Sequence, residues 1–264
     1  MIFHLKTHKL LTTASEIARL KSVQSIYSKR RSFTRNIDKF WNIVLSQHPE
    51  FSEYIRSSDF KFLELIKDIY VSWDVASTSA SEDSTPGDFS ITFEFEGLDD
   101  DFPEQTIVKK FKLETFDPED LPKSKSKKRD IDNSDDEADA DETERLVSES
   151  IDIIWPKSYD SINPSKIQDK KSDAGKKNYR AGMKSFFGWF KWTGRKPGKE
   201  FPSGDDFARL FSEEIFPYAV KYYTEAQRDG LEEEEDSDAS EPLDLSDEEG
   251  DSRGTKRKHE EDDE

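Results

Sequence analysis

The sequence predicts an α+β fold, with a long N-terminal dimerisation helix, a lobe containing a four-stranded antiparallel sheet covered by helices, and a disordered acidic C-terminal tail. Apolar residues at helical spacing continue without glycine or proline until Pro49. Apolar and polar residues then alternate in several short stretches, which is typical of half-buried strands. The residues after Leu231 are mostly acidic and show neither period.

The composition divides the chain into a folded and a solvated part. The 264 residues carry a net charge of −19, and only 32% of them are hydrophobic, against ~45–50% apolar residues in an ordinary globular protein. Aromatic residues make up 12% of the chain and must therefore be concentrated in the folded part. The absence of cysteine excludes disulfides, thiol catalysis and cysteine-based zinc sites.

The sequence contains no motif for catalysis, metal binding or membrane insertion. The four histidines are scattered without metal-ligand spacing: His4, His8, His48 and His259. No apolar run approaches the ~20 residues of a membrane span. A phosphate-binding glycine-rich loop, a nucleophile elbow and a His/Glu metal motif are all missing. We therefore predict no catalytic residue, no metal and no cofactor, and a protein that is not an enzyme.

The N-terminal segment is predicted to form a dimerisation helix over residues 14–36, preceded by an uncertain extension over residues 1–13. A helix from Leu10 to Arg35 would be ~39 Å long at 1.5 Å per residue. Its apolar stripe exceeds what a small domain covers, so the natural recipient is the same helix of a second copy. The predicted interface residues are Ile17, Leu20, Val23 and Tyr27.

A mitochondrial presequence is the alternative interpretation of this segment. Glu16 is the only acid before Asn36, whereas basic, serine and threonine residues are frequent. An acid-poor, arginine-containing start with helical propensity is typical of such a presequence.

Residues 37–227 are predicted to form the lobe. Phe40, Trp41, Val44 and Leu45 make an aromatic helical face that ends at Pro49. Three strands of an antiparallel meander are expected at residues 69–75, 89–95 and 107–113, and a short fourth strand at Ile151–Trp155.

Two polar segments interrupt the lobe. Residues 118–150 combine a basic run with a run of Asp, Glu, Ala, Ser and Asn, and we predict a disordered insertion there. Residues 157–180 are polar and basic and are predicted to form a mobile loop.

The last part of the lobe combines an aromatic cluster with a helical segment. Five aromatic residues fall within residues 186–192 and are predicted to pack in the core. A helix starting near Gly204 carries Asp205 and Asp206 in its first turn, where acids suit the positive end of the helix dipole. A kink is expected at Pro217, and Glu213 and Glu214 fall outside the apolar side.

Residues 228–264 are predicted to be a disordered acidic tail. From Leu231 onwards seventeen acids face four basic residues, a net charge of −13. Such a polyanion repels nucleic acid and attracts basic proteins, of which histones are the most abundant in a nucleus. Lys256, Arg257 and Lys258 are predicted to be a short nuclear-import signal.

Three sequence blocks, followed by the acidic tail, resemble the nucleosome assembly protein (NAP) family, and within it the SET-like branch. The blocks are FWNIVLSQHPEF at residues 40–51, KSFFGWFKW at 184–192 and FSEEIFPYAVKYYTEAQ at 211–227. The blocks occur in order and are separated by the predicted strands. One departure is the start of the chain, which is basic and apolar where the family's dimer helix usually begins with many acids.

The resemblance implies a homodimeric histone chaperone of the nucleus, with shuttling to the cytoplasm left open. Core histones, either the tetramer-forming pair or the flanking pair, would bind a concave acidic underside and the tail. It also implies a histone acetyltransferase as a further partner. The predicted histone-binding residues are Asp205, Asp206, Glu213, Glu214, Glu232, Glu233, Glu234, Glu235 and Asp236. An acidic adaptor or inhibitor that binds an enzyme instead of histones is the alternative.

Overall fold

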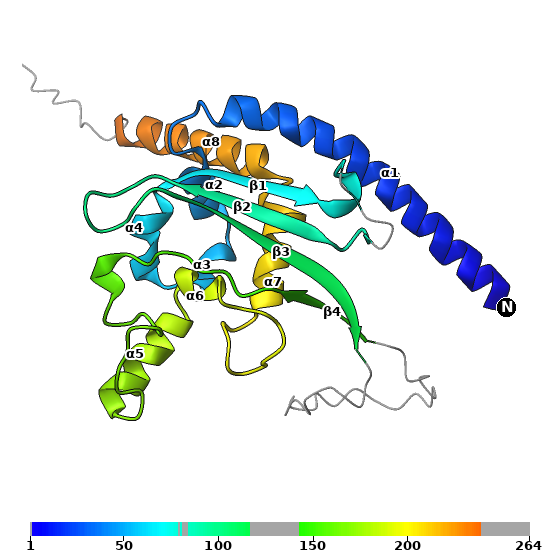
Figure 1. Ribbon diagram of the computed structural model, residues 1–264. Coiled ribbons are helices and arrows are strands. Elements are labelled where there is room, and N and C mark those ends of the chain that lie inside the picture. Colours follow the sequence, from blue (N-terminus) through cyan, green and yellow to red (C-terminus); the bar gives the residue numbers. More distant parts are fainter. Residues whose placement is uncertain (1, 79, 81–83, 117–142, 239–264) are drawn as a thin grey trace, which may run out of the picture. The chain divides into compact units, whose positions relative to one another are not determined.

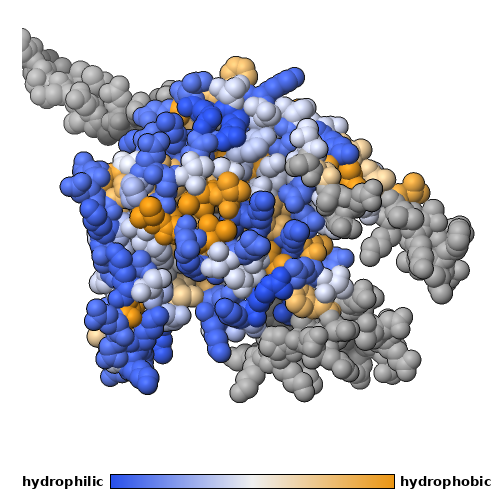
Figure 2. Space-filling model, viewed as in Figure 1, coloured by the Kyte–Doolittle hydropathy of each residue, from blue (hydrophilic) through white to orange (hydrophobic). Residues whose placement is uncertain are grey.

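The computed structural model describes residues 2–78, 80, 84–116 and 143–238. The chain divides into two compact units, residues 1–227 and 228–264. The first unit contains the whole sheet, with helix α1 along one side of it and α6 and α7 against one face (Figure 1). Figure 2 shows a mostly hydrophilic surface on this side, with one group of apolar side chains over the strands.

The long N-terminal helix α1 spans Ile2–Thr34. It therefore includes most of the segment that the sequence left as an uncertain extension. Leu20 is 1% exposed, and Ile17 and Tyr27 pack against the core of the same chain. The expectation that no local domain covers this apolar stripe was wrong, because the helix lies along strand β1 (Ile66–Trp73), and the lobe buries Leu20 and partly buries Ile17 and Tyr27.

Polar side chains fix α1 to the edge of the sheet. The Gln24 amide donates to the Val71 carbonyl (3.2 Å) and accepts from the Trp73 N–H (3.1 Å), which occupies backbone groups of an edge strand. Nearer the end of the helix, Arg31 Nε donates to the buried Asp68 carboxylate at 2.5 Å. The helix and the lobe are thus joined by directional contacts as well as by apolar packing.

Short helices follow α1 and confirm the predicted break at Pro49. Helix α2 spans Phe40–Gln47 and buries the aromatic face that was predicted there. Helices α3 (Phe51–Tyr54), η1 (Ser57–Asp59) and α4 (Phe60–Leu63) lead into the sheet.

The sheet has four antiparallel strands in the order β1-β2-β3-β4, as predicted. Strands β2 (Phe89–Phe95) and β3 (Gln105–Phe116) extend the meander from β1, and buried residues alternate along each of them. The short 3-10 turn η2 (Asp74–Ala76) follows β1.

The fourth strand lies elsewhere than predicted. Strand β4 is Thr143–Ser148, which pairs with β3 and lies within the segment predicted to be a disordered insertion. Residues 151–155 are irregular, although Ile153 and Trp155 are buried. Their alternation reflects packing of Trp155 on Phe187, with ring centroids 5.6 Å apart, rather than a strand ladder. Residues 118–142 of the predicted insertion lie outside the described residues.

The segment predicted as a mobile basic loop contains regular structure. After η4 (Lys157–Tyr159), helix α5 spans Asp173–Met183. The Ser172 hydroxyl caps its start by accepting from the Gly175 N–H at 3.1 Å.

The aromatic cluster of the sequence forms the centre of the core. Helix α6 spans Phe186–Trp189, and its rings surround Phe93 of β2 at centroid distances of 5.7 Å for Phe186 and 6.0 Å for Trp189. This confirms the prediction that these aromatics are buried.

The C-terminal helical segment has three parts. Helix α7 (Gly204–Arg209) continues into the π-helical turn η5 (Leu210–Ile215), and α8 (Ala219–Asp238) starts after a break around Pro217. Helix α8 includes Glu232–Asp236, so the beginning of the predicted disordered tail is helical. Residues 239–264, with the predicted import signal, lie outside the described residues.

Candidate functional site

Four carboxylates gather around Tyr54 at the end of α3. Burial raises the pKa of Tyr54, and the negative charges of Asp206, Glu50, Glu53 and Asp205 raise it further. The Tyr54 ring lies on the Phe207 ring, with centroids 5.1 Å apart, so its position is set by the core. The structure thus brings two predicted acids of α7 together with two acids that the sequence analysis did not select.

A second group of carboxylates lies around Tyr222 of α8. Burial raises the pKa of Tyr222, and the charges of Glu214, Glu225 and Glu50 add to this effect. Glu50 therefore influences both tyrosines and links the two groups. We call the combined set the acidic tyrosine surface; its members are Glu50, Glu53, Tyr54, Asp205, Asp206, Glu214, Tyr222 and Glu225.

The negative charges within this surface repel one another, and the pKa of Asp206 reflects this repulsion. Burial raises the pKa of Asp206, and the neighbouring Asp205 charge raises it further, whereas Ser203 and Arg209 act in the opposite direction. A cationic ligand would relieve this repulsion, so the surface favours binding of positive charge.

His48 lies beneath this surface and was not selected from the sequence, where it was one of four scattered histidines. Its side chain is 1% exposed, and Nε2 lies 3.4 Å from a Glu214 carboxylate oxygen. The ring centroid is 4.9 Å from that of Tyr222. The contact depends on α2 and α8 meeting in the fold, which no local pattern reveals.

Glu213 and Glu214, which the sequence treated together, have different surroundings. Glu213 pairs with Arg209 at 3.2 Å and lines a cleft of about 480 Å³ beside Tyr27 and Trp73. Glu214 belongs to the acidic tyrosine surface instead. Glu232–Asp236 have a described backbone within α8, which does not test their predicted binding role.

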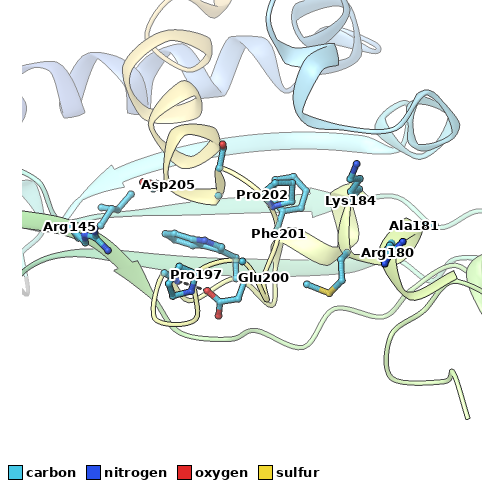
Figure 3. Close-up of a pocket in the computed structure, with 16 residues that line it drawn as sticks. Arg145, Arg180, Ala181, Lys184, Pro197, Glu200, Phe201, Pro202 and Asp205 are labelled. Atoms are coloured by element: carbon cyan, nitrogen blue, oxygen red, sulfur yellow. Dashed lines mark hydrogen bonds between the residues drawn. The ribbon is translucent and has the colours of Figure 1, made fainter. Parts of the chain in front are cut away.

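Another cleft, of about 680 Å³, is lined by side chains from β4, α5 and the loop before α7, and it shares Asp205 with the acidic tyrosine surface (Figure 3). Trp192 and Phe201 contribute rings, and Arg145, Arg180 and Lys184 contribute positive charge. Figure 3 shows Arg145 on one side of the cleft and Arg180 with Lys184 on the other.

The cleft belongs to a basic part of an acidic chain. Residues 143–199 contain thirteen Lys and Arg against six Asp and Glu, a net charge of +7. Sequence patterns indicate only a basic loop in this region and do not reveal the cleft, because its walls come from three elements.

Among the residues that the structure describes, no group of His, Cys, Asp and Glu is arranged to hold a metal ion. None of their helices has the length and apolar character needed to cross a membrane.

Comparisons with known proteins agree with this architecture. A family model for nucleosome assembly protein (NAP) matches residues 8–226. The chain is 48% identical over 235 residues to vacuolar protein sorting-associated protein 75 of Saccharomyces cerevisiae, covering 89% of this chain and 80% of that protein. The crystal structure of the Vps75 histone chaperone superposes with a TM-score of 0.72 at 45% identity, covering 86% of this chain and 95% of that one.

A crystal structure of Ccp1 is more distant but shares the fold. Its TM-score is 0.55 at 25% identity, and the match covers 86% of this chain and 95% of that one. The family model covers more than half of the chain, and the resemblance drawn from the three sequence blocks is confirmed. The chain belongs to the nucleosome assembly protein (NAP) family.

Proposed function

We propose that this protein is a nuclear histone chaperone that binds core histones and supports nucleosome assembly. The observation that carries the proposal is the acidic tyrosine surface, because it concentrates carboxylates and aromatic rings on a folded face. Histones are rich in Lys and Arg, whose charges pair with carboxylates and whose side chains lie favourably on aromatic rings. Family membership and the similarity to a histone chaperone support the same conclusion.

Two parts of the protein, the folded surface and the acidic tail, are expected to bind histones. The folded surface supplies fixed positions for basic side chains, whereas the −13 tail supplies long-range attraction that speeds association. A polyanion without fixed geometry adds affinity but little selectivity between basic ligands.

The proposal is tested by titrating the full-length protein into fluorescently labelled core histones at several salt concentrations, and by measuring nucleosome assembly on plasmid DNA. We expect binding of both histone pairs to be measurable and assembly to increase with chaperone concentration. Binding of DNA alone is expected to be absent, because the net charge of −19 opposes it. A protein that binds no histone at low salt would contradict the proposal.

We further propose that a second copy of the chain packs on α1. On a helix with 100° per residue, Leu11, Ile26 and Phe33 fall within about 60° of one another. They are 66%, 60% and 73% exposed, and they lie roughly opposite Leu20, which faces the lobe. The exposed stripe therefore extends the earlier dimer prediction to a different face of the same helix, since Leu20 is already buried within one chain.

The basic cleft is proposed to serve a partner other than histones, namely a histone acetyltransferase. Arg145, Arg180 and Lys184 give its wall three positive charges against the two negative charges of Glu200 and Asp205, so an acidic segment of another protein fits it better than a histone does. Double replacement Arg180→Glu with Lys184→Glu should abolish recruitment of that enzyme and leave histone affinity within about twofold. Equal loss of both activities would mean that the two surfaces are one site.

If the protein binds an enzyme but no histone, it is an acidic adaptor or inhibitor and not a histone chaperone.

A further inference from the structure

The His48 imidazole is held in one orientation. The Glu50 N–H donates to His48 Nδ1 at 3.2 Å, so this ring nitrogen is the acceptor. The neutral ring therefore carries its hydrogen on Nε2. Nε2 has no hydrogen-bond partner and is buried, yet it lies 3.4 Å from the Glu214 carboxylate. A buried N–H without a partner is costly, and the Glu214 carboxylate, which is 52% exposed, lies close enough that a small movement would complete a hydrogen bond.

The Tyr222 ring is already in contact with an ammonium group. The Lys221 ammonium lies 5.4 Å from the Tyr222 ring centroid and 3.9 Å from the Glu225 carboxylate. The Lys221 side chain is 60% exposed, so it can be displaced. An ammonium beside an aromatic ring and a carboxylate is thus an arrangement that this surface already forms with its own lysine.

We propose that Glu214, placed beside the unpartnered His48 N–H and the Tyr222 ring, forms a binding site for one Lys or Arg side chain of the histone partner. The inference rests on the function proposed above and gives it a defined contact. The ligand's cation would donate hydrogen bonds to the Glu214 carboxylate while its apolar stem lies on the Tyr222 ring, and the nearby Glu225 and Glu50 charges would add attraction.

His48 is a positioning residue in this site, because it is too buried to touch the ligand. A cation bound to one carboxylate oxygen leaves the other oxygen free to accept from His48 Nε2. The contact of 3.4 Å would then shorten on binding. An exposed Glu without such a neighbour would lose side-chain freedom on binding with no further bond in return, whereas Glu214 would gain the His48 N–H as a partner.

The test is a double-mutant cycle with labelled core histones at fixed salt. Glu214→Gln is expected to weaken binding about tenfold, the size of a charge-assisted contact. The matched control is Glu96→Gln, which removes the same charge from an exposed residue after β2 and should change affinity less than about twofold. His48→Phe keeps a flat ring but removes the N–H, and we expect about a threefold loss.

The decisive measurement is the double variant. In the Glu214→Gln background, His48→Phe should produce no further loss, because its role acts through that carboxylate. A general loss of folding would reduce affinity in both backgrounds, and thermal melting of each variant checks for it. Tyr222→Phe should retain binding and Tyr222→Leu should lose it, since the ring face and not the hydroxyl is used.

The outcomes separate this site from the general function. If wild-type protein binds histones and Glu214→Gln weakens binding no more than Glu96→Gln, the site is disproved while the chaperone function stands. An additive loss in the double variant would disprove the positioning role of His48. Absence of histone binding by the wild-type protein would instead contradict the proposed function itself.

Discussion

Lys109 places an amine within the core of the lobe. The side chain is fully buried, and Nζ donates to the carbonyls of Glu149 (3.0 Å), Phe190 (3.1 Å) and Trp192 (2.8 Å). These bonds tie β3 to the chain after β4 and to the aromatic cluster. Burial lowers the pKa of Lys109 from 10.5 to about 7, although the nearby Glu200 charge acts in the opposite direction. The alternating pattern of β3 predicted an inward side chain here but gave no sign of the three carbonyls.

The pKa of Lys109 predicts how stability depends on pH. Because the folded pKa is lower than the unfolded one, the unfolded chain binds more protons between about pH 7 and pH 10.5. The free energy of unfolding should therefore rise with pH across this window, by at most ~1.4 kcal/mol per pH unit from this group. Urea unfolding of wild type and Lys109→Met at pH 7, 8, 9 and 10 should give a difference that grows with pH. Lys110→Met, an exposed neighbour, is the control and should run parallel to wild type. A parallel curve for Lys109→Met as well would show that the carbonyls keep Lys109 charged throughout.

Trp189 is the residue at which core packing is tested most directly. Its ring contacts Phe93, Phe111 and Phe207 at centroid distances of 6.0, 5.6 and 5.1 Å, and its Nε1 donates to a backbone carbonyl. Trp189→Ala should reduce the free energy of unfolding by ~3–5 kcal/mol, a large part of the ~5–15 kcal/mol of a domain. Thermal melting measures the loss, with the exposed Tyr218→Ala as a control expected to change little. A stable Trp189→Ala protein that no longer binds histones would assign the cluster to the binding surface instead.

The elements differ in how far the sequence predicts them. Strands β1 to β3 were placed within a few residues, because one face of the meander is buried and side chains alternate. Strand β4 escaped prediction because Leu146, Val147 and Ser148 are buried in succession, which leaves no period of two. Ser148 N also donates to Thr193 O, so residues outside the sheet cover this edge. The strand depends on partners that are distant in sequence.

Some residues of the candidate site can be predicted from local sequence, and others depend on the tertiary structure. Asp205 and Asp206 were predictable, since two acids opening a helix suit its dipole. Tyr54, Tyr222 and His48 could not be selected, because each gains its surroundings only when α2, α3, α7 and α8 meet.

At the scale of one element, α1 has two apolar faces that serve different purposes. The face with Leu20 binds the lobe, and the face with Ile26 and Phe33 is exposed. Ile26→Asp with Phe33→Asp should produce monomers in light scattering while the melting temperature of the lobe is kept. Leu20→Asp should instead destabilise the fold, because it buries an unpaired charge. Ser28→Asp, an exposed position about a third of a turn away from the centre of the stripe, is the control and should remain dimeric. An unchanged mass for the double variant would place the dimer contact elsewhere.

Charge is unevenly distributed over the whole molecule. Residues 143–199 carry +7, whereas the residues after Leu231 carry −13 and the acidic tyrosine surface adds fixed negative charge to the lobe. The net charge of −19 is therefore a sum over regions of opposite sign. Basic ligands and acidic protein segments would be drawn to different parts of the same chain, which allows two kinds of partner to bind together.

The tail and the folded surface should contribute to histone binding in ways that salt distinguishes. Deleting Leu231–Glu264 removes −13 of charge and leaves the acidic tyrosine surface in place. We expect the truncated protein to bind histones more weakly and with a shallower salt dependence, because exposed charges like those of the tail are screened over ~8 Å at physiological ionic strength. Binding at low salt should persist, because the folded surface remains. A tail of scrambled order and equal composition should restore full affinity, since its contribution needs no geometry.

Glu213→Lys with Glu214→Lys should weaken binding even when the tail is present, because it sets positive charge against a basic ligand. Its charge change of +4 is smaller than the +13 of the truncation. A larger loss of histone selectivity in the reversal than in the truncation would therefore identify the folded surface as the source of specificity. Histone affinity at four salt concentrations for these proteins is the measurement. If truncation abolished binding and reversal had no effect, the lobe would only carry the tail, and the placement of the binding site on the fold would be wrong.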